Sequence, residues 1–204
     1  MTQPVDRLLR GPNDAERRLV LLHGWGADAD DLLELGPLLV GPEVSVVALR
    51  APEAHPYGPG RQWYGLQPID WGQLPVARQA LQQRLEELGQ SVPLPQTVLL
   101  GFSQGGAMAV DVGSTLPLAG IVACSGYPHE GWQPPAAMAP VLLSHGREDP
   151  VVPFAASEQL QRLLQGAGAS PQLLAFSGGH SIDASVLGPI SQFIRGRLAA
   201  EPEG

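Results

Sequence analysis

Six short apolar runs, each ended by glycine, proline or serine, recur along the chain and constrain its fold more than any other feature. Continuous apolar runs of this length, bounded by turn residues, are typical of strands buried on both faces of a parallel sheet. The runs are residues 17–24 (RRLVLLHG), 44–52 (VSVVALRAP), 97–102 (TVLLGF), 118–126 (LAGIVACSG), 140–146 (PVLLSHG) and 171–179 (PQLLAFSGG). We therefore expect a mostly parallel sheet.

Patterns of helical period lie between several of these runs. In residues 74–90, with Pro75 in the first turn and Gly89 near the end, the apolar face is predicted to consist of Val76, Ala80, Leu81, Leu85 and Leu88. Shorter patterns predict helices in residues 28–39, 154–168 and 190–201. Alternating strands and helices imply right-handed crossovers, so we expect a doubly wound α/β sheet in one domain spanning residues 1–204.

Composition narrows the class of protein. A formal net charge of −8 without any basic run argues against a broad nucleic-acid-binding face. The single cysteine, Cys124, excludes an intramolecular disulfide and a zinc site built on several thiolates, and it favours a reducing compartment. The sequence shows neither a signal-peptide core nor an apolar run of about 20 residues, so we expect a cytoplasmic protein without stable membrane insertion.

One serine stands between glycines directly after a predicted strand, in the stretch LGFSQGGA at residues 100–107. G-x-S-x-G after a buried strand and before a helix is typical of a nucleophile elbow. Gly101 and Gly105 leave room for a tight turn that projects the hydroxyl of Ser103 above the sheet edge. The alternative is a tight turn with a passive serine.

A nucleophilic serine needs a base and an orienting carboxylate, and both follow in the order expected for such a fold. Asp149 comes after the predicted strand at 140–146, and His180 comes after the strand at 171–179. We predict that Ser103 attacks an acyl carbon, that His180 takes and returns the proton, and that Asp149 fixes the imidazole tautomer. Glu148 is the alternative carboxylate.

The other four histidines are expected elsewhere. His23 opens a glycine-containing loop and His145 ends a strand, so we expect both to bond neighbouring backbone groups. His55 and His129 lie in proline-rich loops and are expected to be exposed. Asp183, three residues after His180, is expected to cap a helix.

The oxyanion that develops in acyl transfer needs backbone N–H donors. Gln104 follows the nucleophile and supplies one candidate. The stretch LLHGWGAD at residues 21–28 supplies the other, because Gly24 and Gly26 let the chain turn close to the site and leave the Trp25 N–H as a donor.

Five stretches together resemble the carboxylesterase, lysophospholipase and acyl-protein thioesterase family of small α/β-hydrolases. They are LLHGWGADADDL, GFSQGGAMA, SGY, HGREDPVVP and GGH, and the resemblance extends from about residue 18 to 195. It implies an α/β-hydrolase fold with helices on both faces of the sheet and no large lid domain. It also implies the triad roles for Ser103, Asp149 and His180 and the oxyanion role for Trp25 and Gln104. The similar stretch GRQWYG suggests that Arg61 and Trp63 shape a loop beside the site.

Two segments rich in proline, glycine and aromatic residues, 51–72 and 125–140, interrupt the alternation, and the second shows little sign of a helix. Long irregular segments at the carboxyl ends of strands usually build ligand sites in α/β proteins, so we expect both to be pocket walls. Two uses are open for their aromatic residues, lining a substrate pocket or packing the loops onto the body. These residues are Trp63, Tyr64, Trp71 and Trp132.

The predicted activity is hydrolysis of a small-molecule or lipid ester, or of a thioester, with an apolar acyl group and with no metal or cofactor. A non-catalytic binding module on the same fold is one alternative. An acyltransferase that uses the same triad is another. The sequence leaves open whether the protein is a monomer or a homodimer.

Overall fold

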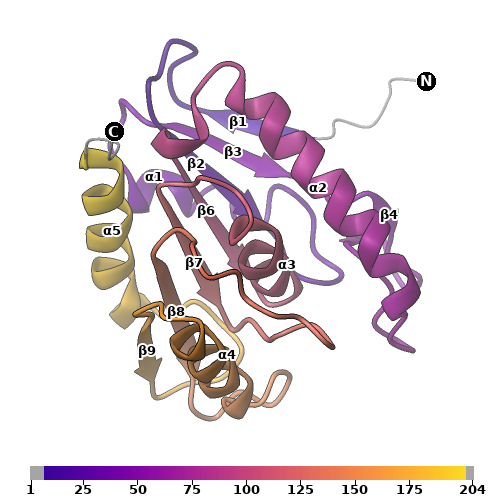
Figure 1. Cartoon of the computed structure of the whole chain (residues 1–204). Coiled ribbons are helices and arrows are strands. Elements are labelled where there is room, and N and C mark those ends of the chain that lie inside the picture. The colour runs from indigo at the N-terminus through magenta and orange to yellow at the C-terminus, as the bar shows by residue number, and fades with distance from the viewer. Residues whose placement is uncertain (1–6, 201–204) are drawn as a thin grey trace, which may run out of the picture.

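The structure, a computed structural model, describes residues 7–200, in which a central sheet lies between two layers of helices (Figure 1). The seven strands follow the order β1-β3-β2-β6-β7-β8-β9, and all neighbours are parallel except the antiparallel pair β1 and β3. Their bounds are β1 Arg7–Arg10, β2 Arg18–Leu22, β3 Ser45–Leu49, β6 Thr97–Phe102, β7 Gly120–Cys124, β8 Val141–Gly146 and β9 Gln172–Phe176. The predicted α/β class and the six predicted strands are confirmed.

The helices cover both faces of the sheet (Figure 1). One face carries α1 and α5, and the other carries α2, α3 and α4. Their bounds are α1 Gly36–Leu39, α2 Leu74–Gly89, α3 Gln104–Gly113, α4 Ala155–Gly166 and α5 Ala184–Ala199. The small elements are the hairpin strands β4 Glu53–Ala54 and β5 Arg61–Gln62 and the 3₁₀ turns η1 Trp71–Gln73 and η2 Leu94–Gln96.

Alternate side chains of each inner strand enter different cores. In β2, Leu19 and Leu21 pack in the cluster under α1 and α5, whereas Val20 and Leu22 pack in the cluster under α2, α3 and α4. Since successive side chains of a strand point to opposite faces, a strand buried on both faces must be apolar throughout. This is why continuous apolar runs, with no polar alternation, mark the inner strands.

Three local features differ from the sequence expectations. Strand β1 was not expected, because its four residues RLLR are mostly exposed at the sheet edge and carry no apolar run. The predicted helix at 28–39 is wrong except for Gly36–Leu39; the residues before it form successive turns, with the Asp31 N–H bonded to the Asp28 carbonyl. The helix predicted from residue 190 begins earlier: α5 starts at Ala184, where Asp183 caps it by accepting from the Ser185 N–H over 2.9 Å, and it includes Pro189.

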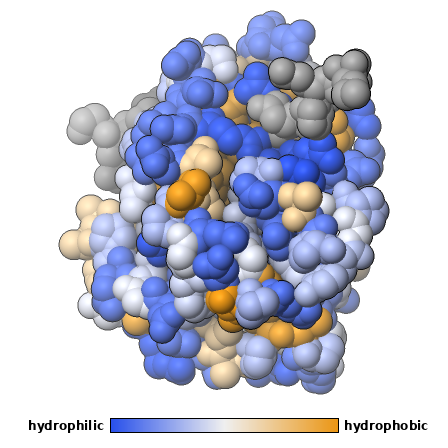
Figure 2. Space-filling view, turned by 90° about the vertical axis from the view of Figure 1, so that its right-hand side faces the viewer, coloured by the Kyte–Doolittle hydropathy of each residue, from blue (hydrophilic) through white to orange (hydrophobic). Residues whose placement is uncertain are grey.

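The predicted apolar face of α2 is also partly wrong. Val76 is 71% exposed, and the buried face instead begins with Leu74 and Ala77 and continues through Leu81, Leu85 and Leu88. Spacings of three and four residues from Leu74 define that face, and Val76 falls outside it. Figure 2 shows that this side of the molecule is mostly hydrophilic, with apolar residues in small separate groups.

The helices within residues 7–200 are too short or too polar to cross a membrane. The two irregular segments expected from the sequence lie between strands of the main sheet, and residues 125–140 contain no helix, as predicted. Within the described residues, neither segment is large enough to form a separate lid domain.

Candidate active site

Ser103 is the residue between β6 and α3, and its backbone is strained. Its φ of 54° and ψ of −118° lie where L-residues with a side chain rarely occur. The turn is tight: a Cβ on Gly101 would lie 2.0 Å from the Gly105 carbonyl oxygen, and a Cβ on Gly105 would lie 2.2 Å from the Leu22 carbonyl oxygen. Only glycine therefore fits at these two positions of the predicted elbow.

The structure brings Ser103, His180 and Asp149 together from three separate loops. Ser103 Oγ lies 3.0 Å from His180 Nε2, and His180 Nδ1 lies 2.7 Å from Asp149 Oδ2. An ionised carboxylate only accepts hydrogen bonds, so the proton is on Nδ1, and Nε2 is free to accept from the serine hydroxyl. The arrangement is that of a nucleophile, a base and an orienting acid.

Asp149 is held from two sides. Its Oδ1 accepts from the backbone N–H groups of Val151 and Val152 over 2.8 and 2.9 Å, in addition to the contact of Oδ2 with His180. Burial raises the pKa of the Asp149 carboxyl, but these hydrogen bonds outweigh it and leave the pKa below its ordinary value. Asp149 is therefore a carboxylate at neutral pH.

Glu148 has a different task from its neighbour. Its Oε2 accepts from the Gly178 N–H over 2.5 Å, and its own N–H donates to the Gly178 carbonyl over 3.1 Å. These two bonds fasten the loop that carries His180. Between the two candidate carboxylates, it is Asp149 that contacts the imidazole.

The loop from His23 to Ala27 passes directly over the serine. A Cβ on Gly24 would lie 3.3 Å from Ser103 Cβ, so the Trp25 backbone is next to the elbow. Gln104 is fully buried at the start of α3. Both residues predicted to supply oxyanion donors therefore lie next to Ser103: Gln104 follows it in the chain, and Trp25 follows Gly24, which approaches it in space.

Residues 61–64 connect the loop of Trp25 with Gln104. The Gly26 N–H donates to the Arg61 carbonyl over 2.9 Å, and Trp25 Nε1 donates to Gln62 Oε1 over 2.8 Å. At the other end, Gln104 Oε1 accepts from the Trp63 N–H over 3.0 Å. Arg61 Nε donates to the Ala51 carbonyl over 3.0 Å and anchors this segment.

The environments of the remaining four histidines agree with the sequence expectation for His23 and His145 and differ from it for His55 and His129. His23 is buried and accepts from the Ala51 N–H at Nε2 over 3.0 Å, and burial is the main cause that lowers its pKa. His145 is buried with both ring nitrogens in contact, as expected of a structural histidine. His55 was also expected to be exposed, but it is half-buried, and its ring centre lies 4.2 Å from that of Trp25. His129 was expected to be exposed, but it is only 3% exposed and contacts Asp111 and Tyr64.

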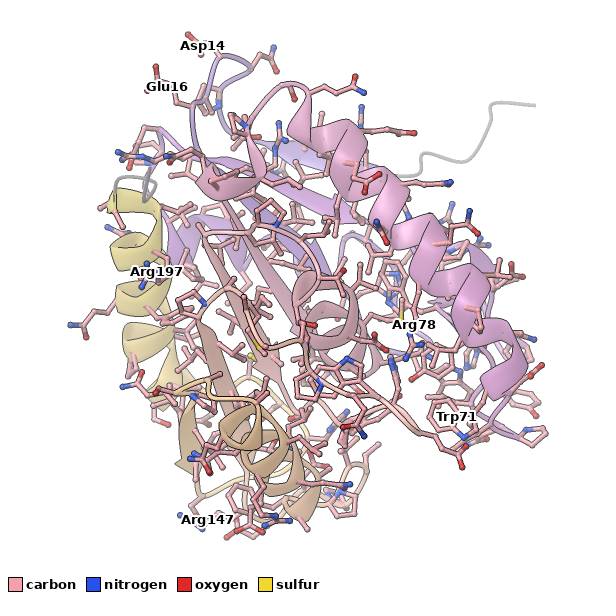
Figure 3. The ribbon with its side chains drawn as sticks, in the orientation of Figure 1. Asp14, Glu16, Trp71, Arg78, Arg147 and Arg197 are labelled. Carbon is pink, nitrogen blue, oxygen red and sulfur yellow. The ribbon has the colours of Figure 1, made fainter. Side chains whose placement is uncertain are left out.

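The four aromatic residues proposed for a pocket differ in burial. Trp63, Tyr64 and Trp132 belong to the core cluster under α2, α3 and α4, with exposed fractions of at most 7%. Trp71 is half-buried and packs against that cluster; Figure 3 shows it at the lower right, near the end of α2. Packing, one of the two uses open for these residues, accounts for the burial of the first three, and contact with a substrate stays a prediction.

A buried polar network joins the two predicted pocket walls and was not foreseen. Asp111 on α3 contacts Arg78 of α2, with Oδ2 2.7 Å from Arg78 Nε, and it also contacts His129 Nδ1. Tyr64 OH lies 3.0 Å from His129 Nε2 and 2.6 Å from Tyr127 OH. The available signal was Asp111 itself, a carboxylate in the otherwise uncharged α3, because a buried charge requires partners.

Burial also governs the ionisation of the two tyrosines and the cysteine. It is the main cause that raises the pKa of Tyr64 far above its ordinary value and the pKa of Tyr127 to about 12. It likewise raises the pKa of the fully buried Cys124 thiol to about 12. All three are protonated at neutral pH, so Cys124 is not a nucleophile. Within residues 7–200, no three metal-ligating side chains gather as a metal site would require.

Comparisons with known proteins identify the family to which this chain belongs. A profile of the phospholipase/carboxylesterase family matches residues 8–198. Acyl-protein thioesterase 1 of Eremothecium gossypii is 25% identical, over 98% of this chain and 95% of its own length. A probable carboxylesterase of Oryza sativa subsp. japonica is 34% identical over 58% of this chain, and the matched part spans about half (48%) of that relative.

Solved structures show the same architecture. The crystal structure of esterase PE8 has a TM-score of 0.85 and 31% identity, covering 94% of this chain and 98% of its own. The Bacillus cereus carboxylesterase has a TM-score of 0.81 at 22% identity and covers 96% of both chains, which supports the fold alone. The predicted α/β-hydrolase fold is confirmed, and the names of these proteins agree with the predicted ester hydrolase class.

Proposed function

Because the chain belongs to the phospholipase/carboxylesterase family, we propose that it is a serine hydrolase that cleaves carboxylic esters through an acyl-enzyme on Ser103. The observation that carries this proposal is the unbroken chain of contacts from Ser103 Oγ through His180 to Asp149, which begins at a strained elbow. A passive turn serine requires neither the strain nor a base within hydrogen-bond distance.

The proposed reaction has two halves. Ser103 Oγ attacks the carbonyl carbon of the ester while His180 Nε2 takes its proton, and the same proton then goes to the leaving alcohol as the carbon–oxygen bond breaks. Water next donates a proton to His180 and attacks the acyl carbon, and Ser103 leaves with that proton. Asp149 stays ionised throughout and stabilises the imidazolium that forms twice in the cycle.

The backbone N–H groups of Gln104 and Trp25 are the proposed donors to the oxyanion. The Gln104 N–H is at the amino end of α3, where the partial positive charge of the helix adds to its effect. The Trp25 position follows from the close approach of Gly24 to Ser103. Loss of one such donor typically costs about 100-fold to 1,000-fold in rate.

The test is hydrolysis of p-nitrophenyl esters from acetate to decanoate by the native protein and by Ser103→Ala. We expect an optimum of chain length in the native protein and a fall of kcat by several orders of magnitude in the variant. A fluorophosphonate probe should label the native protein and spare Ser103→Ala. Ser181→Ala, at the exposed residue directly after His180, is the control and should keep its labelling.

Two alternatives make different predictions. A non-catalytic module would bind esters but would neither turn them over nor react with the fluorophosphonate. An acyltransferase would react with the probe but would pass the acyl group to an added alcohol or amine in preference to water. Product analysis with such acceptors separates it from a hydrolase.

We also propose a single 204-residue domain that acts in the cytoplasm as a monomer or homodimer on a small-molecule or lipid ester. One seven-stranded sheet shared by both cores supports the single domain. The lone, fully buried Cys124 is compatible with a reducing compartment. Size-exclusion chromatography with light scattering measures the oligomeric state.

A further inference from the structure

The residue before the proposed nucleophile contacts the proposed base. Phe102 is the last residue of β6, and its ring centre lies 4.8 Å from that of His180, with an angle of 42° between the two ring planes. Aromatic rings at this separation are in direct contact. Phe102 is half-buried, and the His180 side chain is only 17% exposed, so the contact shields part of the imidazole from solvent.

The hydrogen bonds of His180 leave one motion of its ring unrestrained. They act at its two nitrogen atoms, Nδ1 with Asp149 and Nε2 with Ser103. Rotation about the line that joins these nitrogens keeps both atoms in place, but it turns the Nε2 lone pair away from the serine hydroxyl and weakens that bond. Because Asp149 and Ser103 already occupy the positions at the nitrogens, the Phe102 ring meets the imidazole away from that line and restricts the rotation.

Phe102 is held by a more rigid part of the fold than His180. Strand β6 lies inside the sheet between β2 and β7, with Phe102 in register with Cys124, and the Phe102 side chain packs against the core under α1 and α5. His180 lies in residues 177–183, which form neither helix nor strand. The inner strand therefore fixes the aromatic ring, and the ring limits the position of the loop residue.

The same ring also reaches the loop that carries Trp25. A Cβ on Gly24 would lie 3.4 Å from Phe102 Cδ1, which is ordinary van der Waals contact. Loss of the Phe102 ring could therefore act on catalysis through the base or through the proposed oxyanion donor. An experiment on Phe102 has to separate these two routes.

We propose that Phe102 is a positioning residue for ester hydrolysis: its ring fixes the tilt of the His180 imidazole and so aims the Nε2 lone pair at the Ser103 hydroxyl. The proposal rests on the proposed function of this triad. It gives the position before the serine in G-x-S-x-G a role beyond packing. An aliphatic side chain fills much of the same space in the core, but it does not present a flat ring to the imidazole.

Three substitutions separate the ring contact from the loss of core volume. Phe102→Leu keeps an apolar side chain and removes the ring, and Phe102→Tyr keeps the ring. Phe193→Leu is the matched control, because Phe193 is also half-buried and packs against the same core. It lies at the amino end of β7, where a Cβ on Gly120 would be 3.2 Å from its ring. The measurements are kcat and KM with p-nitrophenyl acetate, together with thermal unfolding of each variant.

We expect kcat of Phe102→Leu to fall about tenfold with KM within about twofold, because a misaligned base affects the transition state and leaves binding of the ester unchanged. We expect kcat of Phe102→Tyr to stay within about threefold of native and kcat of Phe193→Leu to stay within about twofold. A kcat of Phe102→Leu that falls no further than that of Phe193→Leu would overturn the proposal.

A double-mutant cycle shows whether Phe102 acts through His180 or through the Trp25 loop. Serine hydrolases that lack their base retain a residual rate from the oxyanion donors and from binding. If Phe102 acts through His180, adding Phe102→Leu to His180→Ala should change the residual rate by less than about twofold. An equal fall in both backgrounds would assign the effect to the Trp25 loop and contradict the proposal.

NMR of the resting protein tests the restraint without turnover. The His180 ring protons should give one sharp set of signals in the native protein and in Phe102→Tyr, and these signals should broaden in Phe102→Leu. If Phe102→Leu does not fold, Phe102→Met, with its flexible apolar side chain, takes its place in both measurements. A native protein without ester turnover contradicts the proposed function, whereas His180 signals that stay equally sharp without the ring contradict the role of Phe102.

Discussion

The side chain of Gln104 forms two hydrogen bonds with the backbone of Trp63 and Tyr64: Oε1 accepts from the Trp63 N–H over 3.0 Å, and Nε2 donates to the Tyr64 carbonyl over 2.8 Å. Gln104 is fully buried, so neither backbone group has water as a substitute partner. The residue proposed to stabilise the oxyanion through its N–H therefore also holds the 61–64 segment, which binds the loop of Trp25 through Gln62.

Gln104→Met should accordingly impair both stability and catalysis. It leaves two buried backbone groups unpaired, which costs about 1–3 kcal/mol for each group in the free energy of unfolding. We expect kcat to fall about tenfold with a smaller change in KM, because the donors act on the transition state. Urea denaturation and ester kinetics measure these effects. The exposed Gln79 on α2 provides the control Gln79→Met, and equal behaviour of the two variants would contradict this role.

Gly105→Ala should disrupt the elbow, because the added methyl group would lie 2.2 Å from the Leu22 carbonyl oxygen in a rigid inner strand. We expect a loss of about 1–3 kcal/mol or more in the free energy of unfolding and a fall of kcat. Gly188→Ala in α5 is the matched control, since nothing lies within 4 Å of its added methyl group. That variant should gain about 0.5–1 kcal/mol. A Gly105→Ala variant as stable as native would refute the steric account.

The parts of the fold that the sequence predicts well are those with a local signal. Inner strands are apolar throughout because both of their faces are buried, so β2 and β6 are evident without any partner. Strand β1 has no such signal, because pairing with β3 at the sheet edge determines its conformation. Val76 shows a related limit, since an apolar residue at approximately helical spacing can still face solvent.

The candidate site likewise contains some features that have a local signal in the sequence and others that do not. The elbow glycines and the chain order of Ser103, Asp149 and His180 are local features, and the structure brings these three side chains together. The burial of His129 depends on Asp111, 18 residues away in the chain, and sequence spacing does not reveal such a contact. His145 and Asp149 are only four residues apart in the chain, yet their contact requires the turn after β8 to fold back on the strand.

Asp149→Asn should lower kcat by about 10⁴-fold, because an amide at this position no longer fixes the productive tautomer of His180. The lowered pKa of Asp149 also predicts a pH effect on stability. A carboxyl whose pKa is lower in the folded state stabilises the fold above its ordinary pKa of about 3.9, and this contribution is lost as pH falls through the lower, folded value. Urea denaturation at several pH values should therefore show that the stability difference between native and Asp149→Asn shrinks below about pH 4. A difference that is constant down to pH 2 would contradict the shift.

Asp111→Asn tests the network that joins the two predicted pocket walls. Asp111 binds both Arg78 and His129, and removal of its charge leaves a cation and a buried imidazole without their common partner. Because the Arg78 side chain is 35% exposed, we expect a loss of about 2 kcal/mol, below that of a fully buried pair. Asp14→Asn is the control: Asp14 is exposed at the top of the view in Figure 3, away from Arg78, and its change should stay within about 0.5 kcal/mol.

Ester kinetics of Asp111→Asn test whether this network holds the two predicted pocket walls in place. Tyr64 and Tyr127 reach Asp111 only through His129, so a loosened network should raise KM for long-chain esters while kcat per titrated serine stays within about twofold. The elbow itself is held independently, by the bond from the Ser103 N–H to the Cys124 carbonyl and by the glycine contacts with β2. A fall of kcat with unchanged KM would instead mean that the network supports the triad and leaves the pocket walls unaffected.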